Sequence, residues 1–108
     1  LEGQVALVNP ADILNATSED GRTHLHTLNG LIPTHLNLSE LESRLARSGF
    51  FRAHRSYLVN LQHIKEVISY TRDSYTLILD GHQPNTAAPI EIPLSKSAAR
   101  DLRDLLDF

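Results

Sequence analysis

Two arginines and a histidine lie close together in the stretch FFRAHRSYLVNL, residues 50–61. Arg52, His54 and Arg55 directly precede Tyr57-Leu58-Val59, an apolar run that is typical of a β-strand. Arginine carries a planar fork of N–H donors, which can hold guanine O6 and N7 together or contact phosphate oxygens. We therefore interpret the stretch as a loop that a strand fixes in place and that presents cationic donors to a partner.

Three histidines are the second group of side chains with recognisable chemistry. Asn29-Gly30 is a strong signal for a two-residue hairpin turn, and counting back from it puts His24 opposite His35, with His26 on the same face. Neutral imidazoles bind zinc or iron well, so a metal-binding β domain is one alternative. The residues between them would face inward, however, which leaves the histidines on the wetter side without a nearby carboxylate to support a metal.

Sequence signals for catalysis are weak. The chain has no cysteine, which excludes disulfides, thiolate nucleophiles and Cys-ligated zinc. No Gly-x-Ser-x-Gly elbow occurs, the five glycines are too scattered for a phosphate-binding loop, and Ser56 beside His54 is a chance spacing. The sequence therefore predicts no enzymatic activity and no cofactor.

Basic residues are concentrated in the middle of an acidic chain, which has 108 residues and a formal net charge of −3. Acids gather at Glu19-Asp20 and in the C-terminal tail. Between residues 43 and 72 the single acid is Glu66, against six basic residues: Arg44, Arg47, Arg52, Arg55, Lys65 and Arg72. Such an asymmetry is either a solvated face whose counter-charges arrive on folding or a local binding patch.

The length allows one domain with one core, residues 1–108. No apolar run approaches the roughly 18 residues needed to span a bilayer, and nothing resembles a signal peptide. We therefore expect a cytoplasmic domain with no membrane partner. Because the chain begins at Leu1 rather than at methionine, we also expect it to be the C-terminal part of a longer protein.

Short strands must position these side chains, and the sequence predicts about eight of them. Candidates include residues 4–8, residues 13–17, both arms of the Asn29-Gly30 hairpin, the run after Arg55, two arms around a turn at residues 71–74, and residues 90–94. Pro33 makes the second arm of the first hairpin an edge strand, because proline donates no backbone hydrogen bond. Without βαβ alternation, the expected class is mainly β, with antiparallel sheets and two short α-helices.

Local capping signals mark the two helices and one turn. Asn37 and Glu40 are typical of a capping box, and Gly49 is typical of a helix end. Ser95 is the expected N-cap of the second helix, and Asn60 is expected to cap a turn at residues 61–63. The predicted inward-facing residues are Leu38, Leu41 and Leu45 in the first helix and Leu102, Leu105 and Leu106 in the second.

The stretch FFRAHRSYLVNL resembles the signature of the LytTR family of DNA-binding domains. That signature joins two aromatic or apolar residues to Arg, then His-Arg/Asn-Ser, then an apolar strand that ends in Val-Asn. Residues 92–96, Ile-Pro-Leu-Ser-Lys, are similar to the apolar-Pro-Val-Ser-Arg step into the last helix of the family. Asp12-Ile13-Leu14 and the Asn29-Gly30 hairpin also fall where the family has them, so the resemblance covers essentially the whole chain.

The resemblance implies an elongated stack of small antiparallel sheets whose loops, rather than a recognition helix, enter successive major grooves on one side of the duplex. It implies a bacterial transcription regulator that binds double-stranded DNA sequence-specifically, as a homodimer on paired direct repeats, with a sensory or receiver domain upstream in the same chain. One alternative is a protein-interaction module that keeps this fold but has lost DNA binding. The acidic balance of the chain favours this alternative.

Carried over by position, the resemblance places three residues at bases or in the groove: Arg22, Arg55 and Lys96. Gly21 stands where some members have a histidine or a basic residue, which also favours the protein-interaction alternative and shifts the expectation of base reading to Arg22. The residues expected to contact phosphate or to support the loops are Gly21, Arg52, His54, Lys65 and Arg72. Lys96 follows the predicted Ser95 cap, where a phosphate would meet its ammonium and the free N–H groups of a helix start. The acids expected at the far end of that helix, away from DNA, are Asp101, Asp104 and Asp107.

Overall fold

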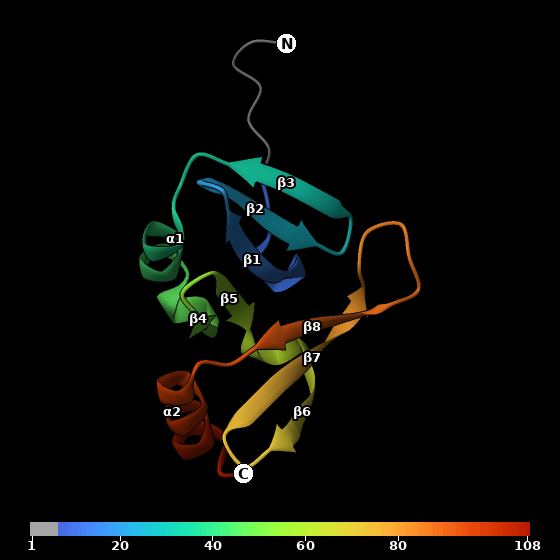
Figure 1. The fold of residues 1–108 in the computed structure, drawn as a ribbon. Helices are drawn as coiled ribbons and strands as arrows, with labels where there is room; N and C mark the ends of the chain where they lie inside the picture. Colours follow the sequence, from blue (N-terminus) through green and yellow to red (C-terminus); the bar gives the residue numbers. More distant parts are fainter. Residues whose placement is uncertain (1–6) are drawn as a thin grey trace.

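The computed structural model describes residues 7–108 as eight strands in two antiparallel sheets with two α-helices (Figure 1). This architecture confirms the mainly β class with two short helices that the sequence predicts. Of the predicted strand at 4–8, residues 4–6 lie outside the described residues, and Leu7 and Val8 belong to no strand. A 3-10 turn, Pro10–Asp12, leads into the first strand instead.

The larger sheet has five strands in the order β3-β2-β1-β5-β4. They are β1 (Ile13–Glu19), β2 (Arg22–Thr27), β3 (Gly30–Thr34), β4 (Phe50–His54) and β5 (Tyr57–Asn60). β3 lies at the edge, as Pro33 predicts. Because β1 pairs antiparallel with β5, and Thr17 lies opposite Tyr57, the β1–β2 turn and the β4–β5 turn come to the same end of the sheet.

The first hairpin turns one residue earlier than the sequence predicts. Thr27 pairs with Gly30, so Leu28 and Asn29 occupy the turn. The Thr27 hydroxyl donates to the Gly30 carbonyl at 2.8 Å and accepts from the Asn29 N–H at 3.1 Å, which closes the turn at these residues. A turn of the predicted kind needs a positive φ at both Asn29 and Gly30, and of the two only Gly30 has one, at 121°.

This register separates the three histidines. His24 lies opposite Pro33, so the predicted pairing with His35 is wrong, and His35 follows the end of β3. His26 is half-buried and borders the space between the two sheets, with its Nε2 3.4 Å from the Thr17 hydroxyl, so the expectation of an outer, wet face is also wrong for this residue. Within residues 7–108, no three His, Cys, Asp or Glu side chains are placed to hold a metal ion.

α1 (Leu38–Arg44) covers one face of the larger sheet (Figure 1). The predicted capping box is present, because Asn37 Oδ1 accepts from the Glu40 N–H at 2.8 Å and the Glu40 carboxylate accepts from the Asn37 N–H at 3.1 Å. Gly49 follows the helix and a short 3-10 turn, with φ 79°, a left-handed conformation that favours glycine. The predicted inward-facing residues are buried against the sheet: Leu38, Leu41 and Leu45.

The smaller sheet packs on the other face of the larger one and has the order β6-β7-β8. Its strands are β6 (Ile64–Thr71), β7 (Ser74–His82) and β8 (Pro89–Pro93), and the predicted turn at 71–74 is confirmed. A 3-10 turn, Leu61–His63, leads into β6. Asn60 caps this turn as predicted, since its side chain accepts from the Gln62 N–H at 3.0 Å. The core between the sheets contains Leu14, Ala53, Val59, Leu77, Leu79, Ile90, Ile92 and Leu102.

α2 (Lys96–Leu106) closes one side of this second core. The hydroxyl of Ser95 accepts from the Ala98 N–H at 3.2 Å, which confirms the predicted N-cap. Leu102 is fully buried, but Leu105 and Leu106 are 58% and 45% exposed, so the prediction that they face inward is wrong. The helix contributes Ala98, Ala99 and Leu102 to the interior, and its last turn extends beyond the core.

Candidate nucleic-acid interface

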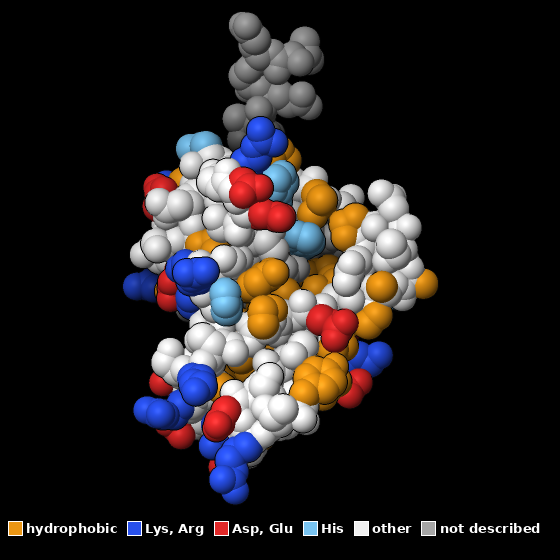
Figure 2. All heavy atoms as spheres, in the orientation of Figure 1, with side chains coloured by type: hydrophobic (Ala, Val, Ile, Leu, Met, Phe, Trp, Pro, Cys, Tyr) orange, Lys and Arg blue, Asp and Glu red, His pale blue; other side chains and the backbone are white. Residues whose placement is uncertain are grey.

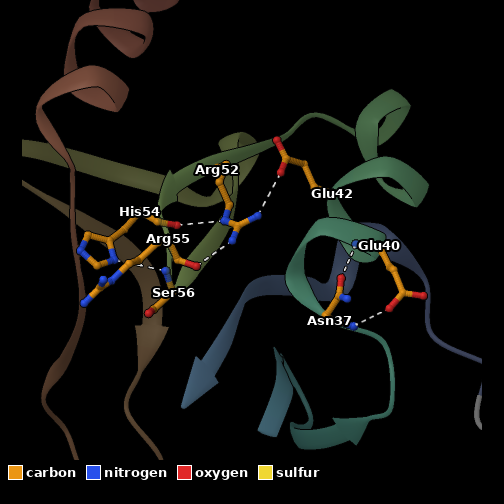
Figure 3. Close-up of polar contacts among 7 residues, drawn as sticks. All are labelled: Asn37, Glu40, Glu42, Arg52, His54, Arg55 and Ser56. Atoms are coloured by element: carbon orange, nitrogen blue, oxygen red, sulfur yellow. Dashed lines mark hydrogen bonds and ion pairs between the residues drawn. The ribbon is translucent and has the colours of Figure 1, made fainter. Parts of the chain in front are cut away.

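Arg52, on β4, uses its whole guanidinium within the protein (Figure 3). Its Nε donates to the His54 carbonyl at 3.0 Å, and one terminal nitrogen donates to the Arg55 carbonyl at 2.7 Å. The other terminal nitrogen pairs with the Glu42 carboxylate at 3.1 Å. Both carbonyls belong to the β4–β5 turn, so this geometry favours a supporting role for Arg52 over the phosphate contact that was its alternative.

His54 holds the same turn from the other side. Its Nδ1 accepts from the Ser56 N–H at 3.2 Å, and its ring meets Tyr57 edge to face with the ring centroids 5.7 Å apart. Because Nδ1 is the acceptor, a neutral His54 carries its proton on Nε2. The backbone of residues 54–56 is thus fixed by the side chains of Arg52 and His54 together.

Arg55 is the opposite case, with a fixed backbone and free donors. Its side chain is exposed, and its guanidinium has no hydrogen bond or ion pair to any residue between 7 and 108. Figure 3 shows the side chain extending past His54 and away from Arg52. Five N–H donors are therefore carried on a turn whose backbone is held, and they have no partner inside the described part of the protein.

Arg55 shares a hollow of about 390 Å³ with the first turns of α2. Ser95 and Ser97 line it from the helix side, and so does Asp101. The sequence placed Asp101 at the far end of α2, and this is wrong, because a residue five positions after Lys96 lies little more than one turn into the helix. An acid therefore faces the same space as the free arginine.

The β1–β2 turn presents Arg22 beside this region. Asp20 and Gly21 form the turn with φ 52° and 75°, and Arg22 is exposed directly after them. The backbone N–H of Ser18 donates to the Ser56 carbonyl at 3.0 Å, which ties the end of β1 to the β4–β5 turn. The first two predicted groove segments are therefore neighbours.

The third segment, at the start of α2, is tied to the same array. The Ser95 N–H donates to the Ala53 carbonyl on β4 at 3.0 Å, next to the turn that carries Arg55. Lys96 follows as the first residue of α2 and is exposed. The structure thus brings Arg22, Arg55 and Lys96 into one succession along the molecule: β1–β2 turn, β4–β5 turn, start of α2.

A second basic cluster lines a hollow of about 410 Å³ between α2 and the β6–β7 turn, and sequence reasoning missed two of its members, Arg100 and Arg103. The cluster consists of Arg72, Lys96, Arg100 and Arg103, together with the acid Asp73. Arg103 donates to the Tyr75 hydroxyl and lies over the rings of Tyr75 and Phe108, 5.5 and 5.9 Å from their centroids. The spacing 96, 100 and 103 is that of one helix face, and this signal was available in the sequence.

Lys65 lies apart from the other predicted residues. It is exposed near the start of β6, whereas Arg72 follows the end of that eight-residue strand. Lys65 borders a different hollow, which Asp80 and Gly81 also line. The structure therefore does not bring Lys65 together with the three turn segments.

Lysine and arginine side chains occur at intervals down the left side of the face in Figure 2, where Figure 1 shows α1, β4 and α2. Aspartates and glutamates lie among them, in keeping with the net charge of −3. The basic side chains thus form a line and not a uniformly positive face. No helix within residues 7–108 is long and apolar enough to cross a membrane.

Residues 3–107 match the family model described as LytTr DNA-binding domain. The chain is 36% identical over 107 residues to the sensory transduction protein LytT of Oceanobacillus iheyensis, covering 98% of this chain and 42% of that protein. It is 32% identical over 95 residues to the transcriptional regulatory protein YpdB of Escherichia coli, covering 88% of this chain and 36% of that protein.

The fold has a solved counterpart in the LytTr DNA-binding domain of a protein from Bacillus cereus. The two structures align with a TM-score of 0.81 at 28% identity, over 94% of this chain and 86% of the other. The chain spans about two fifths of the length of the curated relatives that match it over nearly all of its own length.

Proposed function

The chain belongs to the LytTR family of DNA-binding domains of transcription regulators, and from this premise we propose that its β1–β2 turn, its β4–β5 turn and the start of α2 read successive major grooves of one duplex. The observation that carries the proposal is the contrast within the β4–β5 turn. Arg52 holds two carbonyls of the turn, while the Arg55 guanidinium is left without a partner in residues 7–108. A planar fork of free donors, carried on a backbone that is held in place, is suited to a bidentate contact to guanine.

In this proposal Arg55 makes the central base contact. Arg22 and Lys96 reach the groove on either side of it, because their segments are hydrogen-bonded to the two ends of the same turn region. Arg52, His54 and Gly21 shape the turns and make no direct contact. This division gives the supporting residues a testable signature: their loss disturbs recognition of one sequence more than binding to DNA in general.

Phosphate contacts come from the second basic cluster. Arg72 and Arg100 are exposed on the same hollow as Lys96, so a DNA strand that runs past the start of α2 passes all three. α2 is also long enough for its N-terminus to attract a phosphate through the free N–H groups of its first turn. Lys65 stays a weaker candidate, since it borders a separate hollow.

The whole regulator extends beyond this domain in the proposal. The chain spans about two fifths of the length of relatives named as sensory transduction and transcriptional regulatory proteins, which supports residues 1–108 as one domain of a longer regulator. We place it as the C-terminal output domain of a cytoplasmic protein, with a sensory or receiver domain upstream. The regulator binds paired direct repeats as a homodimer in this proposal, and the domain catalyses no reaction.

Selection of bound sequences from a random duplex library tests the function. We expect enrichment of one short motif by the 108-residue chain, and of two motifs in direct repeat by the full-length regulator. The Arg55→Ala variant should lose preference at one or two base pairs of that motif. Recovery of no motif at low salt, with the fold shown to be intact by circular dichroism, would falsify sequence-specific reading.

A further inference from the structure

A groove of about 620 Å³ runs between the larger sheet and β8. Thr17 and Ser18 of β1 and Tyr57 of β5 line one side, and Ile90 and Ile92 of β8 line the other. Figure 2 shows histidine side chains beside apolar ones across the hollowed middle of this face. The groove adjoins the β4–β5 turn through Ser56, but Arg55 does not line it.

Asn15 lies at the floor of this groove with an amide that has no partner. It is 1% exposed, in the central strand β1, opposite His26 on one side and Val59 on the other. Neither Oδ1 nor Nδ2 makes a hydrogen bond to any of residues 7–108. Nearly all buried polar groups in proteins are paired, and a side chain that leaves both a donor and an acceptor unmet is therefore unusual.

The side chains around Asn15 restrict the charge of any occupant. No lysine or arginine of the described chain lines the groove, whereas Glu19 and Glu91 do. Burial, and to a lesser extent the neighbouring His24, lowers the pKa of His26, so this ring is neutral at pH 7. An anion would thus meet two carboxylates and no lysine or arginine of the described residues, which is the opposite of the DNA-facing turns.

The walls of the groove also restrict the shape of a molecule that could bind there. Tyr57, Ile90 and Ile92 provide flat or branched apolar surface on both sides, and the polar groups lie at the floor and rim. Apolar walls with a few polar groups at fixed positions are the usual composition of small-molecule sites. A flat ring fits between such walls, with its polar edge turned toward the floor.

We propose that this groove binds a small uncharged planar molecule that carries a hydrogen-bond donor and acceptor side by side and pairs them with Nδ2 and Oδ1 of Asn15. A primary carboxamide on an aromatic ring and the amino edge of adenine have this arrangement, and asparagine forms bidentate pairs with such an edge. The two amide atoms are almost fully covered, so binding in this way requires a side chain above Asn15 to change its rotamer. Rotamer changes of this kind are fast, although slower in a packed groove than on the surface.

Two matched pairs of probes test the proposal on the 108-residue chain by NMR titration of the backbone amides. Adenine is compared with purine, which lacks the amino donor, and nicotinamide with nicotinate, which replaces the amide by an anion. We expect saturable shifts for adenine and nicotinamide around residues 15–18, 54–57 and 90–93, and at least tenfold weaker binding of purine and nicotinate. Equal binding within both pairs, or no saturable shift for either adenine or nicotinamide, would overturn the proposal.

Asn15→Val tests the same site from the protein side, with Asn29→Ala on the exposed hairpin turn as control. We expect Asn15→Val to bind adenine at least tenfold more weakly while its melting temperature stays equal or rises, because the unmet amide is gone. Its affinity for DNA should stay unchanged, since Asn15 lies outside the DNA-facing turns. Unchanged adenine binding by a folded Asn15→Val variant would reject the role of the amide, and the probe pairs decide the question even if that variant does not fold.

Discussion

The β4–β5 turn and the second basic cluster, which lies along α2 and the β6–β7 turn, hold their cationic side chains differently. In the turn, one arginine is used inside the protein, since Arg52 holds two carbonyls and Glu42, and its neighbour Arg55 is free on a fixed backbone. On α2, Arg100 is also exposed with no hydrogen bond or ion pair to residues 7–108, but the helix holds its backbone and no neighbouring arginine does. Base reading needs fixed direction, whereas phosphates recur at every nucleotide and tolerate mobile cations. In the proposed function, this difference divides base reading from phosphate contact.

The largest expected effect is at the turn. Arg55→Ala should cost about 1–3 kcal/mol, roughly 5- to 150-fold in affinity, on the selected site, because a bidentate base contact is lost. The loss on a scrambled duplex should be several-fold smaller. Fluorescence anisotropy with both duplexes at one salt concentration measures the two losses of affinity. An equal loss on the two duplexes would show that Arg55 contacts phosphate only.

Replacing Arg52 by lysine should weaken recognition of the selected base sequence without removing a positive charge. Arg52→Lys keeps the cation but lacks the planar fork that reaches both turn carbonyls, so we expect a loss of about 1 kcal/mol or more on the selected site and little change on scrambled DNA. Glu42→Gln is the control, since the two carbonyl contacts of Arg52 remain in it. Wild-type affinity for Arg52→Lys would mean that the turn keeps its shape without the brace.

The second basic cluster should behave in the other way. Arg72→Ala and Arg100→Ala should each weaken binding to selected and scrambled DNA by a similar factor, as should Lys96→Ala if it contacts phosphate alone. Wild-type affinity should fall linearly with salt in log–log form, and each of these changes should reduce the slope by about 0.9, because each removes one phosphate contact. A salt titration of each variant on both duplexes gives the slopes. A sequence-dependent loss at Arg100 would contradict the division.

Replacing Asp101, which lies on α2 and lines the same hollow as Arg55, should have a smaller effect on DNA affinity. From this position the carboxylate of Asp101 opposes an incoming phosphate backbone. Asp101→Asn should raise affinity by roughly twofold at low salt, less at high salt, because exposed charges are screened. Asp104→Asn, nearer the C-terminal end of α2, is the matched control and should change affinity less. If the two changes have equal effects, Asp101 does not face the DNA.

A test by pH addresses a site outside both regions, the half-buried side chain of His26. Burial first, and His24 second, lower the pKa of His26 below its usual value of 6.5. As the pH falls below about 6.5, the unfolded chain therefore takes up a proton at this site before the folded chain does, and stability falls until the pH reaches the folded pKa. Melting temperatures of the wild type and His26→Gln at pH 7.5 and 5.5 measure it. The drop should be smaller in His26→Gln, and an equal drop would place the cause elsewhere.

Features that depend on neighbouring residues could be predicted from the sequence. The caps at Asn37, Asn60 and Ser95 form as expected, because each is a hydrogen bond to a backbone group two or three residues away. The hairpin turn around Asn29 was predicted one residue too late, because the side chain of Thr27 decides where the strands stop pairing. The motif of residues 50–61 was sufficient to indicate the family and the class of function.

By itself, then, the sequence determined the mainly β class, the caps, the edge position of β3 and the choice of Arg55 as the residue to test. The tertiary structure alone decided that Arg52 is a brace, that Arg100 joins Arg72 across a hollow, and that the amide of Asn15 is left unpaired beneath a groove. The physical reason is the distance in sequence between the partners. Arg52 binds Glu42 ten residues away, and Arg100 lines a hollow with Arg72, 28 residues away, so no local pattern encodes either arrangement.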